Sequence, residues 1–237
     1  FQLARDSSFQ NGYDKQHPLW VLLASREALY YLETWQLKTA EQKGLAAVAM
    51  FPRVSGGEPI ADLYFRSRQF KAMAQHFLGK MDAAEAEFEE LIKWIDDLLK
   101  SGIIADKEKP YWQRLKPNLL GRLADAQLFG KGDAEKAAAS WVRATTAGRI
   151  FEGGAKSPFL VRLLFKRSIA YSLSGNLNEA RHSRSEGMRI SETINRDELV
   201  QVYSYYDDAA NAFVKTGPQR IELLVSLLEK AAGKVNK

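Results

Sequence analysis

The sequence contains no cysteine and only three histidines. Without cysteine the chain can form no disulfide, no thiolate metal site and no cysteine nucleophile. The histidines, His17, His76 and His182, fall in different predicted helix hairpins, so no two of them can build a metal site on one helix. We therefore expect neither a metal nor a cofactor.

Long apolar runs and signatures of catalysis are also lacking. The best apolar stretches, around residues 19–24 and 45–51, are far shorter than the ~20 residues that cross a bilayer, so no membrane span is expected. No glycine-rich phosphate loop or nucleophile elbow is present, and adjacent acids such as Asp96 and Asp97 point to different sides of a helix. The prediction is a protein that is not an enzyme; scattered catalytic residues are the alternative.

Charge is present in both signs. The 237 residues carry 34 lysines and arginines against 29 acids, a net charge of +5 that is spread along the chain. A nucleic-acid binder usually concentrates its basic residues on one face or one helix, and no such cluster occurs, so we expect no nucleic-acid partner. The fractions of hydrophobic and charged residues, 46% and 27%, are those of an ordinary globular protein.

The apolar residues follow the period of an α-helix, with little of the alternation that indicates strands. About ten helices are predicted, over residues 18–35, 40–51, 60–78, 82–100, a stretch opened by Pro110, 133–148, 159–174, 177–194, 197–215 and 219–232. The breaks at 52–59 and 153–158 are too short to be linkers, which predicts one continuous domain over residues 1–237.

Local signals place some of the helix ends. Asp82 followed by Glu85 predicts a capping box, in which each side chain bonds a free backbone amide at the start of a helix. Asp133 is expected to cap the helix that follows it. Pro117 should kink or split its helix, because its ring crowds the preceding turn and it has no amide hydrogen to donate.

One sequence pattern recurs along the chain. It is clearest in residues 169–180, IAYSLSGNLNEA, where a glycine turn separates two helices, and looser versions surround Gly79, Gly130 and Gly217. The first hairpin lacks the glycine. Small residues at the helix crossings allow close packing, and we expect Ala170, Ala180 and Ala210 at such crossings and Ala138 on an outer face.

These hairpins resemble the tetratricopeptide-repeat superfamily over about residues 60–232, although the turn glycines are more widely spaced than its ~34-residue unit. The resemblance implies an all-α fold, a right-handed α-solenoid of antiparallel helix hairpins. It also implies that the first helix of each hairpin lines a concave groove that holds a peptide or another protein.

The resemblance assigns candidate groove residues to four hairpins. The candidates are Arg68, Lys71, Gln75, Asn118, Arg122, Asp125, Arg162, Phe165, Lys166, Asp207, Asp208 and Asn211. Some family members grip a terminal carboxylate with a basic clamp, whose positions Lys71, Gln75, Arg162 and Lys166 partly match. Gln75 and Gly121 stand where that clamp has asparagines, and this departure weakens the match.

The predicted function is therefore a non-enzymatic adaptor that binds a peptide or protein segment in its groove. The alternative is a small-ligand sensor or an enzyme on the same scaffold. That alternative requires a closed pocket with convergent polar groups, for example near Trp112 or Phe165.

Overall fold

The computed structural model describes residues 17–51, 58–151, 157–194, 207–215 and 217–235. Within these ranges the chain consists of helices and turns and contains no strand, which confirms the all-α prediction. No helix in this part of the chain is long and apolar enough to span a membrane. The chain divides into two compact units, residues 1–105 and 106–237.

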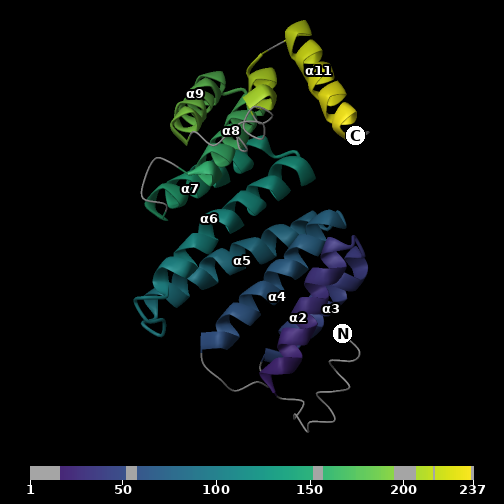
Figure 1. Cartoon of the computed structure of the whole chain (residues 1–237), viewed down its shortest axis with the longest axis vertical. Coiled ribbons are helices and arrows are strands. Elements are labelled where there is room, and N and C mark those ends of the chain that lie inside the picture. The colour runs from purple at the N-terminus through teal and green to yellow at the C-terminus, as the bar shows by residue number, and fades with distance from the viewer. Residues whose placement is uncertain (1–16, 52–57, 152–156, 195–206, 216, 236–237) are drawn as a thin grey trace. The chain divides into compact units, whose positions relative to one another are not determined.

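The first unit contains four helices, which are α2 (Pro18–Glu33), α3 (Leu37–Met50), α4 (Glu58–Phe77) and α5 (Met81–Lys100). Each helix packs on the next one in the sequence, and α2 also packs on α4 (Figure 1). The side chains of Phe65, Phe88, Leu91 and Ile95 fill the interior. Their spacing on α5 gives that helix one strongly apolar face, which explains why it packs as it does.

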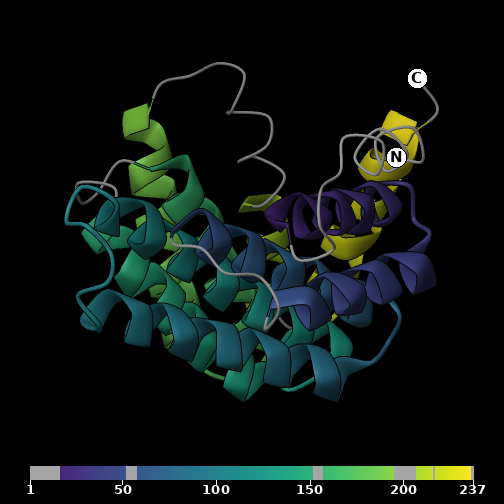
Figure 2. The same cartoon turned by 90° about the horizontal axis from the view of Figure 1, so that it is seen from below.

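The second unit contains α6 (Lys109–Asp125), the π-helix η2 (Ala126–Gly130), α7 (Ala134–Phe151), α8 (Pro158–Leu173), α9 (Leu177–Ile194), a helical segment at 207–214, and α11 (Pro218–Val235). Here too α6 packs on α7, α7 on α8 and α8 on α9; Figure 2 shows the ribbon from below. Trp141, Leu120, Leu164 and Phe165 form the centre of the core.

Three hairpin turns share one geometry. In the turn after α8, Asn176 donates its amide to the carbonyl of Tyr171 at 2.8 Å, and Gly175 is left-handed with φ +84°. The turn after α4 repeats both features around Gly79, with φ +78°. This hydrogen bond across the end of a helix, with a left-handed residue before the donor, is the Schellman motif. The predicted glycine turns at Gly79 and Gly175 are therefore confirmed, and Gly217 is left-handed as well, with φ +61°.

The first hairpin makes the same turn without a glycine. Gln36 donates to the carbonyl of Tyr31 at 2.8 Å, and Trp35 takes the left-handed position with φ 57°. A bulky residue in this conformation is strained, because its Cβ crowds the backbone. The indole of Trp35 lies 5.2 Å from the ring of Phe77 between centroids, a contact that offsets part of this strain.

The third hairpin differs from the prediction. Gly130 is not the turn residue: α6 continues through η2, and the left-handed glycine is Gly132, with φ +71°. Lys131 donates to the carbonyl of Ala126, five residues back, which is the hydrogen bond of a π-helix. Ser140 on α7 donates to the buried side chain of Gln127 at 2.8 Å, so that the wider turn is tied to the neighbouring helix.

The structure shows how two of the predicted helix starts are capped. Asp133 caps α7 as predicted, accepting from the amide of Lys136 at 3.0 Å. The capping box predicted at Asp82 is wrong, because α5 begins one residue earlier and its N-cap is Lys80, whose side chain does not cap the first turn.

Two further expectations concern buried residues. Pro117 does not split α6, which runs through it. Ala170, Ala180 and Ala210 are fully buried as expected, but the outer-face prediction for Ala138 is wrong, because that residue is only 3% exposed.

Two predicted segments are described only in part. The predicted breaks at 52–59 and 153–158 lie mostly outside the described residues, as do positions 197–206 of the helix predicted over 197–215. The remainder of that helix is found at 207–214.

Candidate functional site

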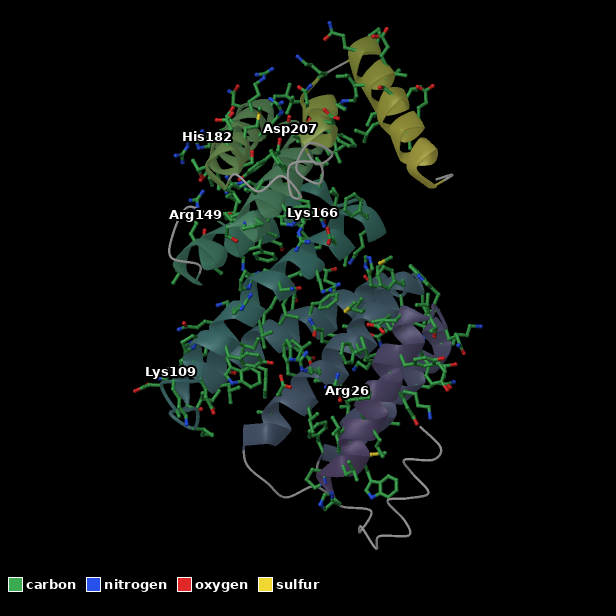
Figure 3. The ribbon with its side chains drawn as sticks, in the orientation of Figure 1. Arg26, Lys109, Arg149, Lys166, His182 and Asp207 are labelled. Carbon is green, nitrogen blue, oxygen red and sulfur yellow. The ribbon has the colours of Figure 1, made fainter. Side chains whose placement is uncertain are left out.

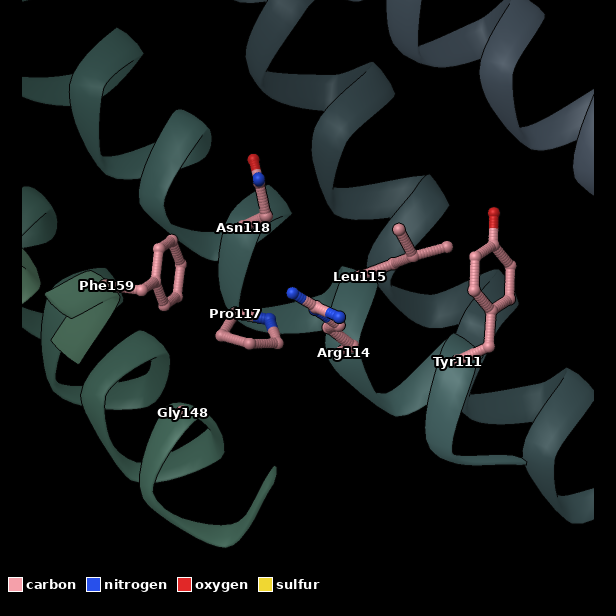
Figure 4. Close-up of a pocket in the computed structure, with 7 residues that line it drawn as sticks. All are labelled: Tyr111, Arg114, Leu115, Pro117, Asn118, Gly148 and Phe159. Atoms are coloured by element: carbon pink, nitrogen blue, oxygen red, sulfur yellow. The ribbon is translucent and has the colours of Figure 1, made fainter. Parts of the chain in front are cut away.

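Two adjoining clefts lie on the second unit, along α6, α7 and α8. The larger, of about 320 Å³, is lined by Tyr111, Arg114, Leu115, Pro117, Asn118, Gly148 and Phe159 (Figure 4). The smaller, of about 230 Å³, is lined by Asn118, Gly121, Arg122, Asp125, Trp141, Phe159, Arg162, Leu163 and Lys166. Asn118 and Phe159 line both clefts, so the two adjoin, and we call them together the depression.

The period of the α-helix brings these residues onto common faces. Tyr111, Leu115, Asn118, Arg122 and Asp125 are separated by three or four positions, so they form one stripe along α6. On α8, Phe159, Arg162 and Lys166 form a second stripe for the same reason. The two stripes supply most of the walls of the depression.

Two glycines line the clefts, and one of them, Gly121, allows α6 to approach α8 closely. A Cβ atom on Gly121 would lie 3.3 Å from Cδ2 of Leu163, and one on Gly148 would lie 3.9 Å from side-chain atoms of Leu160 and Leu163. Gly148 was predicted to end its helix, but α7 continues to Phe151. Gly148 therefore does not terminate the helix, and a Cβ atom at this position would make only ordinary van der Waals contacts.

Arg122 is held by a neighbour on its own helix. Its Nε donates to Oδ1 of Asn118 at 3.2 Å, one turn away. Burial lowers the pKa of Arg122; Asp125 acts to raise it and the positive charge of Arg162 acts to lower it. No carboxylate among the described residues lies within ion-pair distance of this guanidinium. The guanidinium groups of Arg122 and Arg162 both line the smaller cleft.

Arg162 is oriented by an aromatic ring. Its guanidinium carbon lies 5.3 Å from the ring centroid of Phe159, the distance of a cation–π contact. It too has no ion-pair partner among the residues that the structure describes. Its side chain is exposed, whereas the ring beneath it is half-buried.

Lys166 and Asp125 close one end of the smaller cleft. The ammonium group of Lys166 (Figure 3) donates to both carboxylate oxygens of Asp125, at 2.7 and 2.8 Å. The same group lies 5.9 Å from the ring centroid of Trp141. Asp125 is the only acid among the described residues that line either cleft, and Lys166 already binds it.

The groove candidates of the first unit make ion pairs within that unit. Arg68 on α4 donates to Glu87 and to Glu90 on α5, and Lys71 also pairs with Glu87. Burial alone would lower the pKa of Arg68, but the hydrogen bonds to the two glutamates outweigh it and raise the pKa above its usual value. Arg68 is 9% exposed, so it presents little surface to a ligand.

Gln75 completes the candidates of the first unit. Its side-chain amide donates to Oε1 of Glu41 at 3.3 Å, while Lys80 donates to the other oxygen of Glu41 at 2.6 Å. The positions that partly match a carboxylate clamp are therefore divided between two units, and Lys71 and Gln75 already contact acids of their own unit.

The remaining candidates lie at other places in the second unit. Phe165 is fully buried, and its ring packs against Gly187 on α9. Asp207 accepts from Arg184 at 2.9 Å; burial raises the pKa of Asp207, Arg184 acts to lower it, and Asp208 acts to raise it. Asp208 and Asn211 are half-buried in the same segment.

The sequence pattern missed part of the depression. Tyr111, Arg114, Leu115 and Phe159 line it but were not among the candidates. Continuing the spacing of three or four residues backwards from Asn118 and from Arg162 would have found them. Among the described residues, no group of acids and histidines is arranged to hold a metal ion.

Comparison of the chain with models of protein families, with curated proteins and with solved structures finds no match.

Proposed function

We propose that the protein is a non-enzymatic adaptor of the tetratricopeptide-repeat type, a right-handed α-solenoid that binds an acidic peptide or protein segment. Two features support the solenoid. The same Schellman turn closes three hairpins, and within the units the consecutive helices α2 to α5 and α6 to α9 pack on one another. The binding surface in this proposal is the depression along α6 and α8.

The observation that carries the proposal is the pair formed by Arg122 and Arg162. Both guanidiniums face one cleft, each is held in place by a neighbour, and neither has an acid within ion-pair distance among the described residues. Cations held close together without counter-charges form a site for an anion. The flanking rings of Tyr111 and Phe159 would contact apolar parts of the same segment.

Binding is proposed rather than catalysis because of what lines the clefts. The side chains are cationic, aromatic, aliphatic or amide in character, and the one carboxylate accepts two hydrogen bonds from Lys166. A general base has to be free to accept a proton from the substrate. Asp125 in this pairing is a poor candidate for that role.

The test is a fluorescence-anisotropy titration of the full chain with short labelled peptide pools that contain aspartate and glutamate. The variant Arg122→Gln/Arg162→Gln should weaken binding about tenfold or more, because a hydrogen bond to a charged group contributes about 1.5 kcal/mol or more. Its melting temperature should be unchanged, since neither side chain forms an ion pair within the described part of the fold.

The matched control is Arg143→Gln/Arg181→Gln. These two arginines are exposed on α7 and α9 and line neither cleft, so their replacement removes the same charge elsewhere. Equal losses of affinity in the two double variants would refute the site, and no binding by any acidic pool would refute the function. Lys166 is left intact because reversing its charge would place a second acid beside Asp125.

The alternative, a small-ligand sensor or enzyme on this scaffold, has one observation in its favour. The larger cleft, of about 320 Å³, lies at the lower end of the ~300–1,000 Å³ that small-molecule sites occupy. Calorimetric titration with small di- and tricarboxylic acids tests it. Tight binding of one of these, with weak binding of every peptide pool, would favour the alternative.

A further inference from the structure

We propose that Arg122 and Arg162 form a subsite for a phosphoryl group, so that the bound segment is a phosphorylated peptide. The inference rests on the proposed function and specifies the chemistry of its ligand. Two properties of the smaller cleft support it: the hydrogen-bond donors that remain unused there, and the negative charge that a ligand must carry to neutralise both guanidiniums.

The first donor set belongs to Arg122. Only its Nε is used, in the bond to Asn118, and this bond fixes the plane of the guanidinium. The two terminal nitrogens make no hydrogen bond to any described residue. They form a fork of parallel N–H donors, the arrangement that binds carboxylates and phosphates through two bonds.

The second donor set belongs to Arg162. Its guanidinium lies over the ring of Phe159 and makes no hydrogen bond within the described part of the chain, so all of its N–H groups are available. The aromatic contact restricts the side chain without using a donor. Both arginines are thus oriented before a ligand arrives, which reduces the entropy lost on binding.

The count of charges favours a phosphoryl group over a carboxylate. A carboxylate carries one negative charge and would neutralise one of the two guanidiniums. A phosphoryl group carries about −1.5 to −2 at neutral pH and offers three acceptor oxygens, enough for both forks. Lys166 does not supply the main recognition, because Asp125 already accepts from it at 2.7 and 2.8 Å.

The surroundings favour a peptide over a nucleic acid. The cationic cleft is small, about 230 Å³, and the cleft that continues it is bordered by Tyr111, Leu115 and Phe159. Nucleic-acid sites follow a phosphate backbone with a stripe of cations. Here Arg122 and Arg162 line one small cleft, Arg114 lines the adjoining one, and apolar side chains border both, as suits a single phosphorylated residue among ordinary side chains.

The experiment compares three peptide pools that are identical except at one central position, which is phosphoserine, glutamate or serine. Anisotropy titrations of the full chain should give about tenfold tighter binding for phosphoserine than for glutamate, because one more charge is neutralised by charge-assisted hydrogen bonds. Serine should bind most weakly.

Acidity supplies a second readout. Between about pH 7.5 and pH 5.5 the phosphoryl group takes up its second proton, with a pKa near 6, and loses one negative charge. The phosphoserine pool should therefore weaken several-fold, while the glutamate pool should not. Among the described residues, the charged groups that line the two clefts are Arg114, Arg122, Asp125, Arg162 and Lys166. None of these ordinarily titrates in this interval.

The variant Arg122→Lys/Arg162→Lys separates charge from geometry. It keeps both positive charges but removes the planar forks, so the preference for phosphoserine over glutamate should fall about threefold or more. The control Arg143→Lys/Arg181→Lys should leave the preference unchanged. A preserved preference in the first variant would overturn the assignment to these two side chains.

The outcomes separate the inference from the function. Equal affinity for the phosphoserine and glutamate pools overturns the phosphoryl subsite and leaves an acidic-segment adaptor. Weak binding of all pools overturns both. Inorganic phosphate alone, or a single-stranded oligonucleotide, that binds at these arginines more tightly than the phosphoserine pool also overturns the peptide assignment.

Discussion

The helices α4, α6 and α8 each form the first helix of a hairpin, but their basic side chains face different neighbours. Arg68 and Lys71 point at α5, which presents Glu87 and Glu90 to them. Arg122 and Arg162 face a cleft in which Asp125, the one acid among the described lining residues, is bound to Lys166. The first set holds two helices together, whereas the second leaves donors available to a ligand.

The comparison shows that a basic residue on the first helix of a hairpin is not in itself a sign of a binding site. Its role depends on the charge of the helix that packs against it. Acids on α5 engage the basic side chains of α4 in ion pairs, and the pair of Arg68 with Glu87 is buried and therefore matters for stability. Removing an acid from a paired basic side chain, or adding one beside an unpaired basic side chain, should therefore change stability and ligand affinity in predictable directions.

The largest effect is expected from Glu87→Gln in the first unit. The change leaves Arg68 and Lys71 without the acid that both contact, and Glu87 is only 8% exposed. Removing one partner of a buried ion pair costs about 3 kcal/mol, so urea denaturation should show a loss of about that size in the free energy of unfolding.

Glu89→Gln is its control, because Glu89 is exposed on the same helix. It should change the free energy of unfolding by no more than about 0.5 kcal/mol. Similar losses in the two variants would mean that the α4–α5 ion pairs contribute little to the fold.

A smaller effect is expected from Asp125→Asn in the second unit. It removes the acid that Lys166 contacts, a pair whose side chains are 28% and 21% exposed. Partly exposed pairs contribute up to about 1 kcal/mol, so stability should fall by that amount or less. Binding of acidic or phosphorylated peptides should become tighter, because a third cation is released into the cleft.

Asp106→Asn is the matched change at an exposed pair, that of Asp106 with Lys109. It should alter neither the unfolding curve nor peptide affinity. Weaker peptide binding in Asp125→Asn would mean that Asp125 assists the ligand instead of restraining Lys166.

The smallest change in stability is expected from Asn118→Asp. It gives Arg122 an acid one turn earlier on α6, so that Arg122 is paired with an acid, as Arg68 and Lys71 are on α4. Such a pair on one helix stabilises by about 0.3–0.5 kcal/mol. Peptide affinity should fall several-fold, since the new carboxylate occupies Arg122.

Asn118→Ala separates the charge from the lost amide. It removes the hydrogen bond to Arg122 without adding an acid, so its effect on affinity should be clearly smaller than that of Asn118→Asp. Equal effects would show that orientation of Arg122, and not its free charge, controls binding.

Much of the helical framework was predictable because its signals are local. The periodicity placed α5, α8 and α9 within a few residues of their observed bounds, and Gly79 and Gly175 marked left-handed turns. Local rules failed where contacts between helices compensate for an unfavourable conformation. Trp35 takes a position typical of glycine while its ring contacts Phe77, and η2 extends α6 past the expected turn while Gln127 bonds to Ser140.

The candidate site was predictable only in outline. Arg122, Arg162 and Lys166 do line one cleft, because residues three or four apart on a helix share a face. Phe165 lies one position from Lys166, yet its side chain packs into the core against α9. Consecutive side chains on a helix point in very different directions. A shift of one residue in the assumed register therefore mistakes a core residue for a cleft residue.

The sequence by itself determined that the chain is helical, where most helices begin and end, and which side chains carry charge, because these properties depend on neighbouring residues. Only the tertiary structure decided which charges are neutralised. Glu87 and Glu90 on α5 reach Arg68 across a helix interface, Glu41 on α3 reaches Gln75 on α4, and nothing equivalent reaches Arg122 or Arg162 among the described residues. Electrostatic pairing depends on distance in space, which periodicity along the chain does not encode.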